Sequence, residues 1–87
     1  MTWAVKLTRD AEKQLTKIRG RDRARIEAAI AQLAINPYAG DIKALRGYAG
    51  KSFRRRVGNW RIIFTIYHDE IVVEVEDVLR RSSTTYS

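Results

Sequence analysis

The chain has 87 residues, enough for one small domain over 1–87, and 45% of them are hydrophobic, which is typical of a globular chain. It contains no cysteine, signal-peptide pattern or apolar run of about 20 residues, which excludes disulfides and thiolate metal sites and predicts a cytoplasmic protein. Seventeen Lys and Arg against ten Asp and Glu give a net charge of +7, which favours an anionic partner over a surface that is basic only for solubility.

The first half of the chain predicts one strand followed by two helices. Residues 3–7 alternate between apolar and polar, which indicates a half-buried strand. Thr8 can cap a helix that follows, and Gly20 is expected to end that helix. A second helix is predicted from 21 to 35, because Pro37 disfavours helix in the residue before it. The expected apolar faces are Trp3, Val5 and Leu7 in the strand, Ala11, Leu15 and Ile18 in the first helix, and Ile26, Ala29, Ile30, Leu33 and Ala34 in the second.

The second half predicts a loop and then a run of strands. Residues 37–50 hold three of the five glycines and the only proline, so they are expected to form a loop. The order βααβββ predicts an α+β domain, in which an antiparallel sheet carries the helical hairpin on one face. The predicted strands are 51–57, 60–67 and 71–79, joined by turns at Gly58-Asn59 and at 68–70 and followed by a polar tail over 80–87.

The most informative segment is the arginine-rich hairpin. A two-residue turn at 58–59 places Arg56 opposite Arg61, and alternation along the strands places Arg54 on the same face. Like charges this close repel, which favours an anion-binding site over a basic edge that only prevents aggregation. Arg55 falls on the core face, unless a bulge or a snorkelling stem brings its charge out. The expected core face consists of Phe53, Val57, Trp60, Ile62 and Phe64.

The tail adds further candidate residues. Arg80 and Arg81 leave the last predicted strand, and Tyr86 lies almost at the end of a Ser/Thr-rich segment. Tyr86 is either part of a frayed terminus or a platform that stacks on a base. The single histidine, His68, is in a predicted turn and is expected to be structural rather than catalytic.

The order of elements and motifs resembles the RelE/ParE toxin superfamily over nearly the whole chain. The motifs that carry this resemblance are Leu45-Arg46-Gly47, the hairpin 56–61, the turn 68–70 and the basic tail with Tyr86. The RelE branch implies a ribosome-dependent mRNA endoribonuclease (an mRNA interferase) that inhibits translation and uses no metal or cofactor. The ribose 2′-hydroxyl attacks the adjacent phosphate and the 5′ oxygen leaves. The resemblance also implies a type II toxin–antitoxin system, with a cognate antitoxin, the ribosome and mRNA as partners.

The resemblance implies roles for individual residues. Arg54 matches the position of a base, Arg61 the arginine that stabilises the phosphate, and Arg80 or Arg81 the acid. A guanidinium holds its proton above a pH of about 12, so Arg54 is a poor proton acceptor. No carboxylate or imidazole is expected nearby to substitute, and the site is expected to work mainly by electrostatic stabilisation. Tyr86 would stack on or orient the nucleotide, Arg56 and Lys51 would contact RNA, and Ser52 stands where some members have a basic residue.

Other interpretations stay open. The ParE branch shares the fold but acts on DNA gyrase, and it generally lacks the basic cluster with a terminal tyrosine. A nucleic-acid-binding module without catalysis is a second alternative, and a degenerate toxin that only binds antitoxin is a third. An antitoxin helix or added strand could fill grooves along the helices and the exposed sheet. No membrane partner is expected, since no long helix pairs an apolar face with a basic one.

Overall fold

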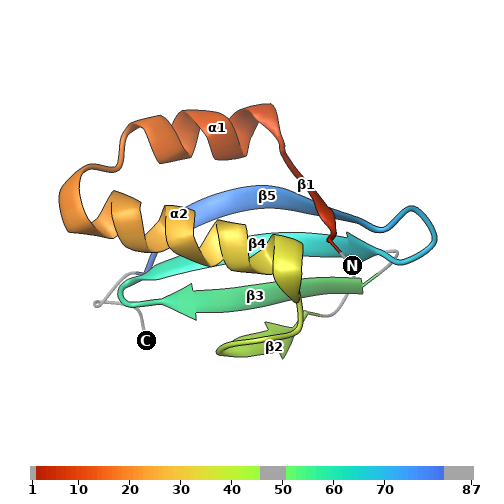
Figure 1. The fold of residues 1–87 in the computed structure, drawn as a ribbon. Coiled ribbons are helices and arrows are strands. Elements are labelled where there is room, and N and C mark those ends of the chain that lie inside the picture. The colour runs from red at the N-terminus through yellow and green to blue at the C-terminus, as the bar shows by residue number, and fades with distance from the viewer. Residues whose placement is uncertain (1, 46–50, 82–87) are drawn as a thin grey trace.

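Two helices cover one face of a five-stranded sheet in the computed structural model, which describes residues 2–45 and 51–81 (Figure 1). The predicted α+β class, with the helical hairpin on one face, is confirmed. No helix within these ranges is long and apolar enough to cross a membrane. The elements are β1 (Ala4–Leu7), α1 (Arg9–Thr16), α2 (Gly20–Ile35), β2 (Ile42–Ala44), β3 (Lys51–Val57), β4 (Trp60–Tyr67) and β5 (Val72–Arg80).

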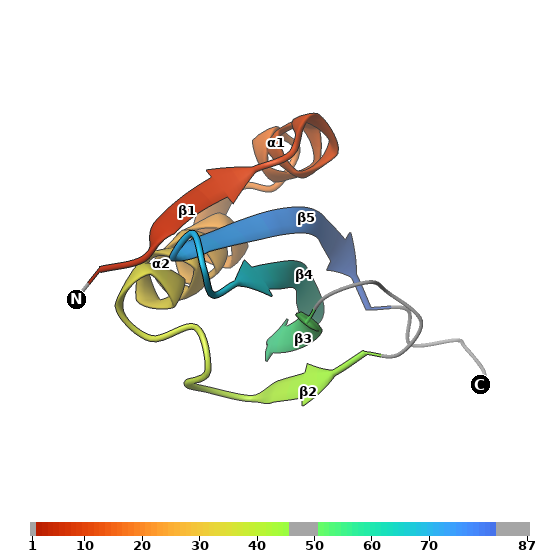
Figure 2. The same ribbon diagram turned by 90° about the vertical axis from the view of Figure 1, so that its right-hand side faces the viewer.

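The sheet differs from the expectation in two respects. Its strand order is β1-β5-β4-β3-β2, and β1 runs parallel to β5, so the sheet is mixed rather than wholly antiparallel. The two helices and the strands β2 to β4 lie between β1 and β5 along the chain, which gives the long connection that a parallel pair requires. The second difference is β2, an edge strand inside the segment expected to be a loop (Figure 2). Its three residues pair with β3, for example Ile42 with Arg55, so this pairing rather than a local pattern makes it a strand.

The helix ends are partly as predicted. The Thr8 hydroxyl accepts a hydrogen bond from the Ala11 N–H at 3.1 Å, which confirms the N-cap of α1. The expectation that Gly20 ends α1 is wrong, because α1 stops at Thr16 and Gly20 is the first residue of α2. Gly20 has φ +66°, a left-handed conformation that glycine adopts without steric cost, and it turns the chain between the two helices. The end of α2 before Pro37 is confirmed.

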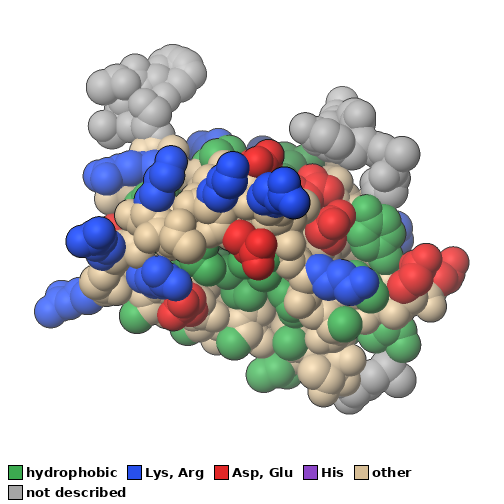
Figure 3. Space-filling model, turned by 90° about the horizontal axis from the view of Figure 1, so that it is seen from above, with side chains coloured by type: hydrophobic (Ala, Val, Ile, Leu, Met, Phe, Trp, Pro, Cys, Tyr) green, Lys and Arg blue, Asp and Glu red, His purple; other side chains and the backbone are tan. Residues whose placement is uncertain are grey.

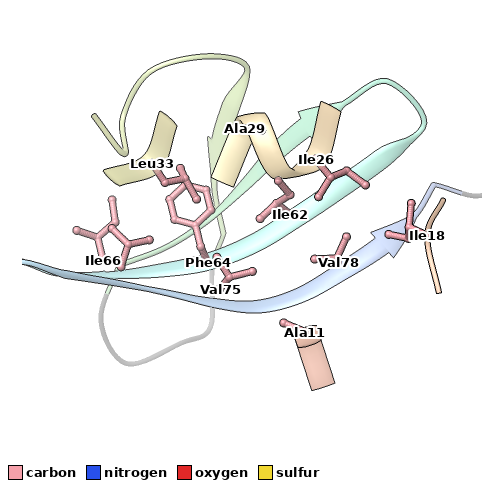
Figure 4. Packing of buried hydrophobic residues seen from close by; sticks show 11 residues of the cluster. Ala11, Ile18, Ile26, Ala29, Leu33, Ile62, Phe64, Ile66, Val75 and Val78 are labelled. Carbon is pink, nitrogen blue, oxygen red and sulfur yellow. The ribbon is translucent and has the colours of Figure 1, made fainter. Parts of the chain in front are cut away.

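The core lies between the helices and one face of the sheet (Figure 4). In α2 the predicted apolar stripe is buried at Ile26, Ala29 and Leu33. It packs on Ile62 and Phe64 of β4, which are fully buried. Because side chains alternate along a strand, the residues between them must point to the opposite side of the sheet. We call that side, away from the helices, the outer face.

Candidate nucleic-acid interface

The β3–β4 hairpin has the predicted register. Val57 pairs with Trp60 across a two-residue turn, and Arg56 pairs with Arg61. Gly58 has φ +58° in this turn, which a residue with a side chain rarely adopts. Phe53, Val57 and Trp60 pack against the core, as expected, so the arginines that alternate with them, Arg54, Arg56 and Arg61, point to the outer face. The structure therefore brings Arg54, Arg56 and Arg61 together there.

The charges of this cluster are not compensated. The Nε atoms of Arg56 and Arg61 are buried and have no hydrogen-bond partner within the described residues. The one ion pair in that part of the chain joins Arg23 to Glu27 on α2, so no carboxylate neutralises the three guanidiniums. Buried donors are nearly always paired in native proteins, and an unpaired one requires an explanation. An anion on the outer face would reduce the repulsion among the three guanidiniums.

Two further residues on the outer face were missed by the sequence analysis. Lys43 of β2 pairs with Arg54, so it adds a fourth positive charge beside the cluster. It was missed because its segment was expected to be a loop. Leu79 of β5 pairs with Arg61 and is 42% exposed, which is high for a leucine within a strand. With Ile63, which pairs with Arg54, it forms an apolar floor beside the guanidiniums. Such a floor can pack against a ribose or a base.

The two tail arginines are separated by the structure. Arg80 still belongs to β5, where it pairs with Trp60 and holds its guanidinium 5.9 Å from the centre of that indole ring. Since Trp60 packs against the core, Arg80 lies on the helix side of the sheet. The Arg81 N–H donates to the Asn59 carbonyl at 2.6 Å and extends the ladder by one position. Alternation then places the Arg81 side chain on the outer face, two residues after Leu79.

The other candidate residues lie elsewhere. Lys51 pairs with buried Ile66, so its side chain is on the helix side of β3, and the structure does not bring it to Arg54. Tyr86 lies outside the described residues, as do Arg46, Gly47 and Tyr48 of the loop. Ser52 is buried at the outer face, where its hydroxyl lies 3.0 Å from that of Thr65.

Arg55 has a structural position on the core side of β3. Its guanidinium donates to the Ala29 carbonyl at 3.4 Å and to the Gln32 side chain, both on α2. A methyl group on Gly40 would lie 2.9 Å from the Arg55 Cζ, so only glycine leaves room there for the guanidinium. Arg55 is thus on the core face, where alternation places it, and α2 holds its guanidinium on the helix side of the sheet.

Towards its other end, the outer face carries negatively charged rather than positively charged side chains. The Thr65 hydroxyl donates to the Glu76 carboxylate at 2.8 Å, and the Tyr67 hydroxyl lies 3.5 Å from Glu74. Desolvation raises the pKa of Tyr67, and the negative charges of Glu74 and Glu76 raise it further. Glu74 and Glu76 therefore lie on the face that carries the arginines, where alternation from buried Val73 and Val75 places them.

His68 lies in the turn between β4 and β5, at the far end of β4 from the arginine hairpin. It hydrogen-bonds to the Tyr38 hydroxyl and packs edge-on against Trp3, with ring centres 5.4 Å apart. These contacts agree with the structural role expected of it. Across 2–45 and 51–81, no three acidic or histidine side chains gather closely enough to hold a metal ion.

A fold of two helices on a five-stranded mixed sheet, with a basic outer face, defines a class of small toxins. Residues 5–84 match the family described as ParE toxin of type II toxin-antitoxin system, parDE. The chain therefore belongs to this family, within the RelE/ParE superfamily, and is a toxin of a type II toxin–antitoxin system. No curated protein is similar enough in sequence to be matched.

Solved RelE toxins share the fold. The archaeal RelE–RelB complex from Pyrococcus horikoshii OT3 contains a chain with TM-score 0.82 and 22% identity, covering 95% of this chain and 99% of that one. A chain of the toxin–antitoxin complex RelBE2 from Mycobacterium tuberculosis has TM-score 0.77 and 29% identity, covering 93% and 100%. The isolated E. coli RelE toxin has TM-score 0.74 and 18% identity, covering 92% and 85%.

Proposed function

We propose that this toxin is an mRNA endoribonuclease that holds its substrate across the outer face. The observation that carries the proposal is the convergence of Arg54, Arg56 and Arg61 on one face, with no carboxylate within ion-pair distance of them in the described part of the chain. A phosphate accepts two hydrogen bonds from a guanidinium in a fixed geometry, and positive charge is needed where the phosphorane-like transition state develops. Ile63 and exposed Leu79 offer an apolar floor for the adjoining nucleotide.

The proposed roles follow from position on the sheet. Arg61 and Arg56 hold the scissile phosphate, and Arg54 and Lys43 hold its neighbours along the strand. Arg81, on the same face, stabilises the departing 5′ oxygen, whereas Arg80 supports the fold through Trp60. Tyr86 stacks on a base, as the resemblance to RelE toxins implies. The cleavage occurs on mRNA in the ribosome and proceeds through the 2′-hydroxyl without a metal ion.

An antitoxin is the proposed protein partner. The RelBE2 complex from Mycobacterium tuberculosis and the RelB–RelE complex from Methanococcus jannaschii contain chains that are 29% and 28% identical to this one. Both are complexes of a toxin with its antitoxin. A RelB-like antitoxin with an acidic surface would complement a chain of net charge +7.

The second candidate function is inhibition of DNA gyrase. The family match supports it, because that family is described by its ParE toxins. The uncompensated arginine cluster favours the ribonuclease, since a site for phosphate is what its geometry offers.

Primer extension on mRNA bound to stalled ribosomes tests the proposal. The wild-type protein is expected to cut the mRNA, and Arg61→Ala to lower the cleavage rate by about 10²–10³-fold. Arg23→Ala, which removes an exposed charge on α2 of the same sign, is the matched control and should cut like the wild type. Intact mRNA together with loss of gyrase supercoiling activity would refute the ribonuclease and support the gyrase alternative.

A further inference from the structure

The geometry points to Glu76 as the proton acceptor for the 2′-hydroxyl, an inference that rests on the proposed ribonuclease function. Glu76 is the extra residue of a β-bulge, because Phe64 pairs with Val75 while the preceding Ile63 pairs with Asp77. Its carboxylate receives the hydrogen bond of Thr65 on the outer face. The next carboxylate, Asp77, accepts instead from the Gln14 amide of α1, on the helix side. Alternation from buried Val75 thus places Glu76 on the arginine face and Asp77 on the helix side, and the bulge returns Val78 to the core.

The Glu76 carboxylate is held in position from two sides. Thr65 donates to Oε2 at 2.8 Å, and the Ser52 hydroxyl lies 3.0 Å from Thr65. Both hydroxyl residues are only 3% exposed. The Thr8 hydroxyl donates to the Glu76 backbone carbonyl at 2.9 Å and so anchors the bulge to the start of α1. Within the described residues no donor contacts the other carboxylate oxygen, Oε1, which can therefore accept a proton.

The distance between Glu76 and the arginine cluster is large enough for one nucleotide to lie between them. Ile63 lies between Arg54 on β3 and the bulge on β5, so two strand spacings, about 10 Å, separate the basic and acidic strands. Long arginine side chains span part of that distance. A ribose over Ile63 would then have its scissile 3′ phosphate against Arg61 and its 2′-hydroxyl towards Glu76. Glu74 and Tyr67 flank Glu76 on the other side, where Lys6 of β1 pairs with Glu74.

With Glu76 as the proton acceptor, every proton and bond in the cleavage step is accounted for. The 2′-hydroxyl proton passes to Oε1 of Glu76, and the 2′ oxygen forms a bond to phosphorus. The bond from phosphorus to the 5′ oxygen breaks, and that oxygen takes a proton from water. The products are a 2′,3′-cyclic phosphate and a 5′-hydroxyl, and Glu76 returns its proton to solvent. The guanidiniums are thereby left with the task they can perform, which is stabilising negative charge.

Glu76→Gln tests the assignment, because glutamine keeps an oxygen that accepts from Thr65 but cannot take a proton at neutral pH. We expect the cleavage rate to fall by about 10²–10⁴-fold, while RNA affinity and melting temperature stay near those of the wild type. The pH profile should also change. Between about pH 6 and 9 the variant rate should remain proportional to hydroxide concentration, whereas the wild-type rate should depend on it much less steeply because the side chain supplies the base.

Glu74→Gln is the matched control, since it removes a carboxylate two residues away that points to Tyr67, and it should cleave at the wild-type rate. The experiment distinguishes a wrong role for Glu76 from a wrong function for the protein. If the wild-type protein cuts mRNA and Glu76→Gln cuts it equally fast with the same pH profile, the role of Glu76 is refuted and the ribonuclease stands. If the wild-type protein does not cut, the proposed function itself fails and the role of Glu76 fails with it.

Discussion

At the scale of single residues, the hairpin arginines reduce the stability of the fold in which they stand. Arg56 and Arg61 are direct cross-strand partners, and like charges in that relation destabilise a sheet by up to about 1 kcal/mol. Each also leaves a buried Nε without a partner in the described part of the chain. Residues that lower stability in this way are expected at functional sites, where the missing partner is the ligand.

Arg56→Gln should therefore separate stability from function. We expect the free energy of unfolding to rise by roughly 0.5–1 kcal/mol, since the repulsion with Arg61 disappears. The slope of log K against log salt for single-stranded RNA should become shallower by about 0.7, the loss of one phosphate contact. Urea denaturation and filter binding measure the two quantities. Arg23→Gln, which breaks an exposed pair with Glu27, should leave the salt slope unchanged. An unaltered slope in Arg56→Gln would mean that this side chain contacts no phosphate.

The tail arginines should also differ. Arg80 is stacked on Trp60, whereas Arg81 is placed by the strand ladder on the outer face. Arg80→Ala is expected to cost about 0.5–1 kcal/mol of stability from the lost cation–π contact and to keep most of the cleavage activity. Arg81→Ala should lower cleavage and leave the melting temperature near that of the wild type. The reverse pattern, measured by primer extension and thermal unfolding, would show that Arg80 is the residue that contacts RNA.

At the scale of elements, one side chain joins α1 to the bulge of β5. Thr8 caps α1 through Ala11 and donates to the Glu76 carbonyl. Thr8→Ala removes both bonds, and we expect it to lower the free energy of unfolding by about 1–2 kcal/mol. Thr8→Ser keeps the hydroxyl and is the control, with only a small loss. Because Thr8 anchors the bulge that carries Glu76, Thr8→Ala should also slow cleavage under conditions where the protein remains folded. Normal stability and activity in this variant would contradict the role given to Thr8.

The elements that the sequence predicted correctly are those whose structure depends on residues close to them in the sequence. The hairpin register follows from Gly58-Asn59 and the alternation of apolar side chains, and the N-cap of α1 follows from Thr8. The features that were missed depend on contacts between distant parts of the chain. The β2 strand exists because Ile42 pairs with Arg55, and β1 is parallel because Ala4 pairs with Val72.

The same distinction applies to the site. The arginine cluster was predictable, since alternation within one hairpin places Arg54, Arg56 and Arg61 together. Alternation from Val73 and Val75 places Glu76 on this face too, but its position beside Thr65 depends on the register of β5 with β4 and on the hydrogen bond from Thr8, which no local pattern shows. Alternation did place Arg55 on the core side. Its accommodation there needed Gly40, whose φ of +89° and missing side chain leave room for the guanidinium.

At the scale of the whole molecule, the charge of +7 is unevenly distributed. The α1–α2 connection, the β3–β4 turn and the end of β5 lie at the same end of the molecule (Figure 1). Seen from the helix side, Lys and Arg side chains gather at that end, while most acidic side chains lie nearer the other (Figure 3). Arg25 of α2 reaches to within 3.8 Å of the position a methyl group would take on Gly58, so the basic helix corner adjoins the hairpin turn.

This polarity predicts how the protein meets RNA. Summed charge of one sign speeds the approach of a polyanion, and salt screens the effect over a Debye length of about 10 Å at 0.1 M. The double variant Arg21→Glu and Arg25→Glu reverses charge at the basic end, on residues exposed in α2. We expect its association rate with single-stranded RNA at low salt to fall by about tenfold or more, as measured by stopped-flow fluorescence.

The matched control is Lys6→Glu and Arg9→Glu, which changes the net charge equally but lies on β1 and at the start of α1, away from the hairpin turn. Its association rate should fall much less, because β5 and β4 separate β1 from the arginine strand β3, so the reversed charges lie farther from the cluster. Both variants should approach the wild-type rate as salt is raised to about 1 M, where the Debye length is about 3 Å. If the two double variants slow association equally, only net charge matters, and the concentration of basic residues at the hairpin end has no part in orienting the RNA.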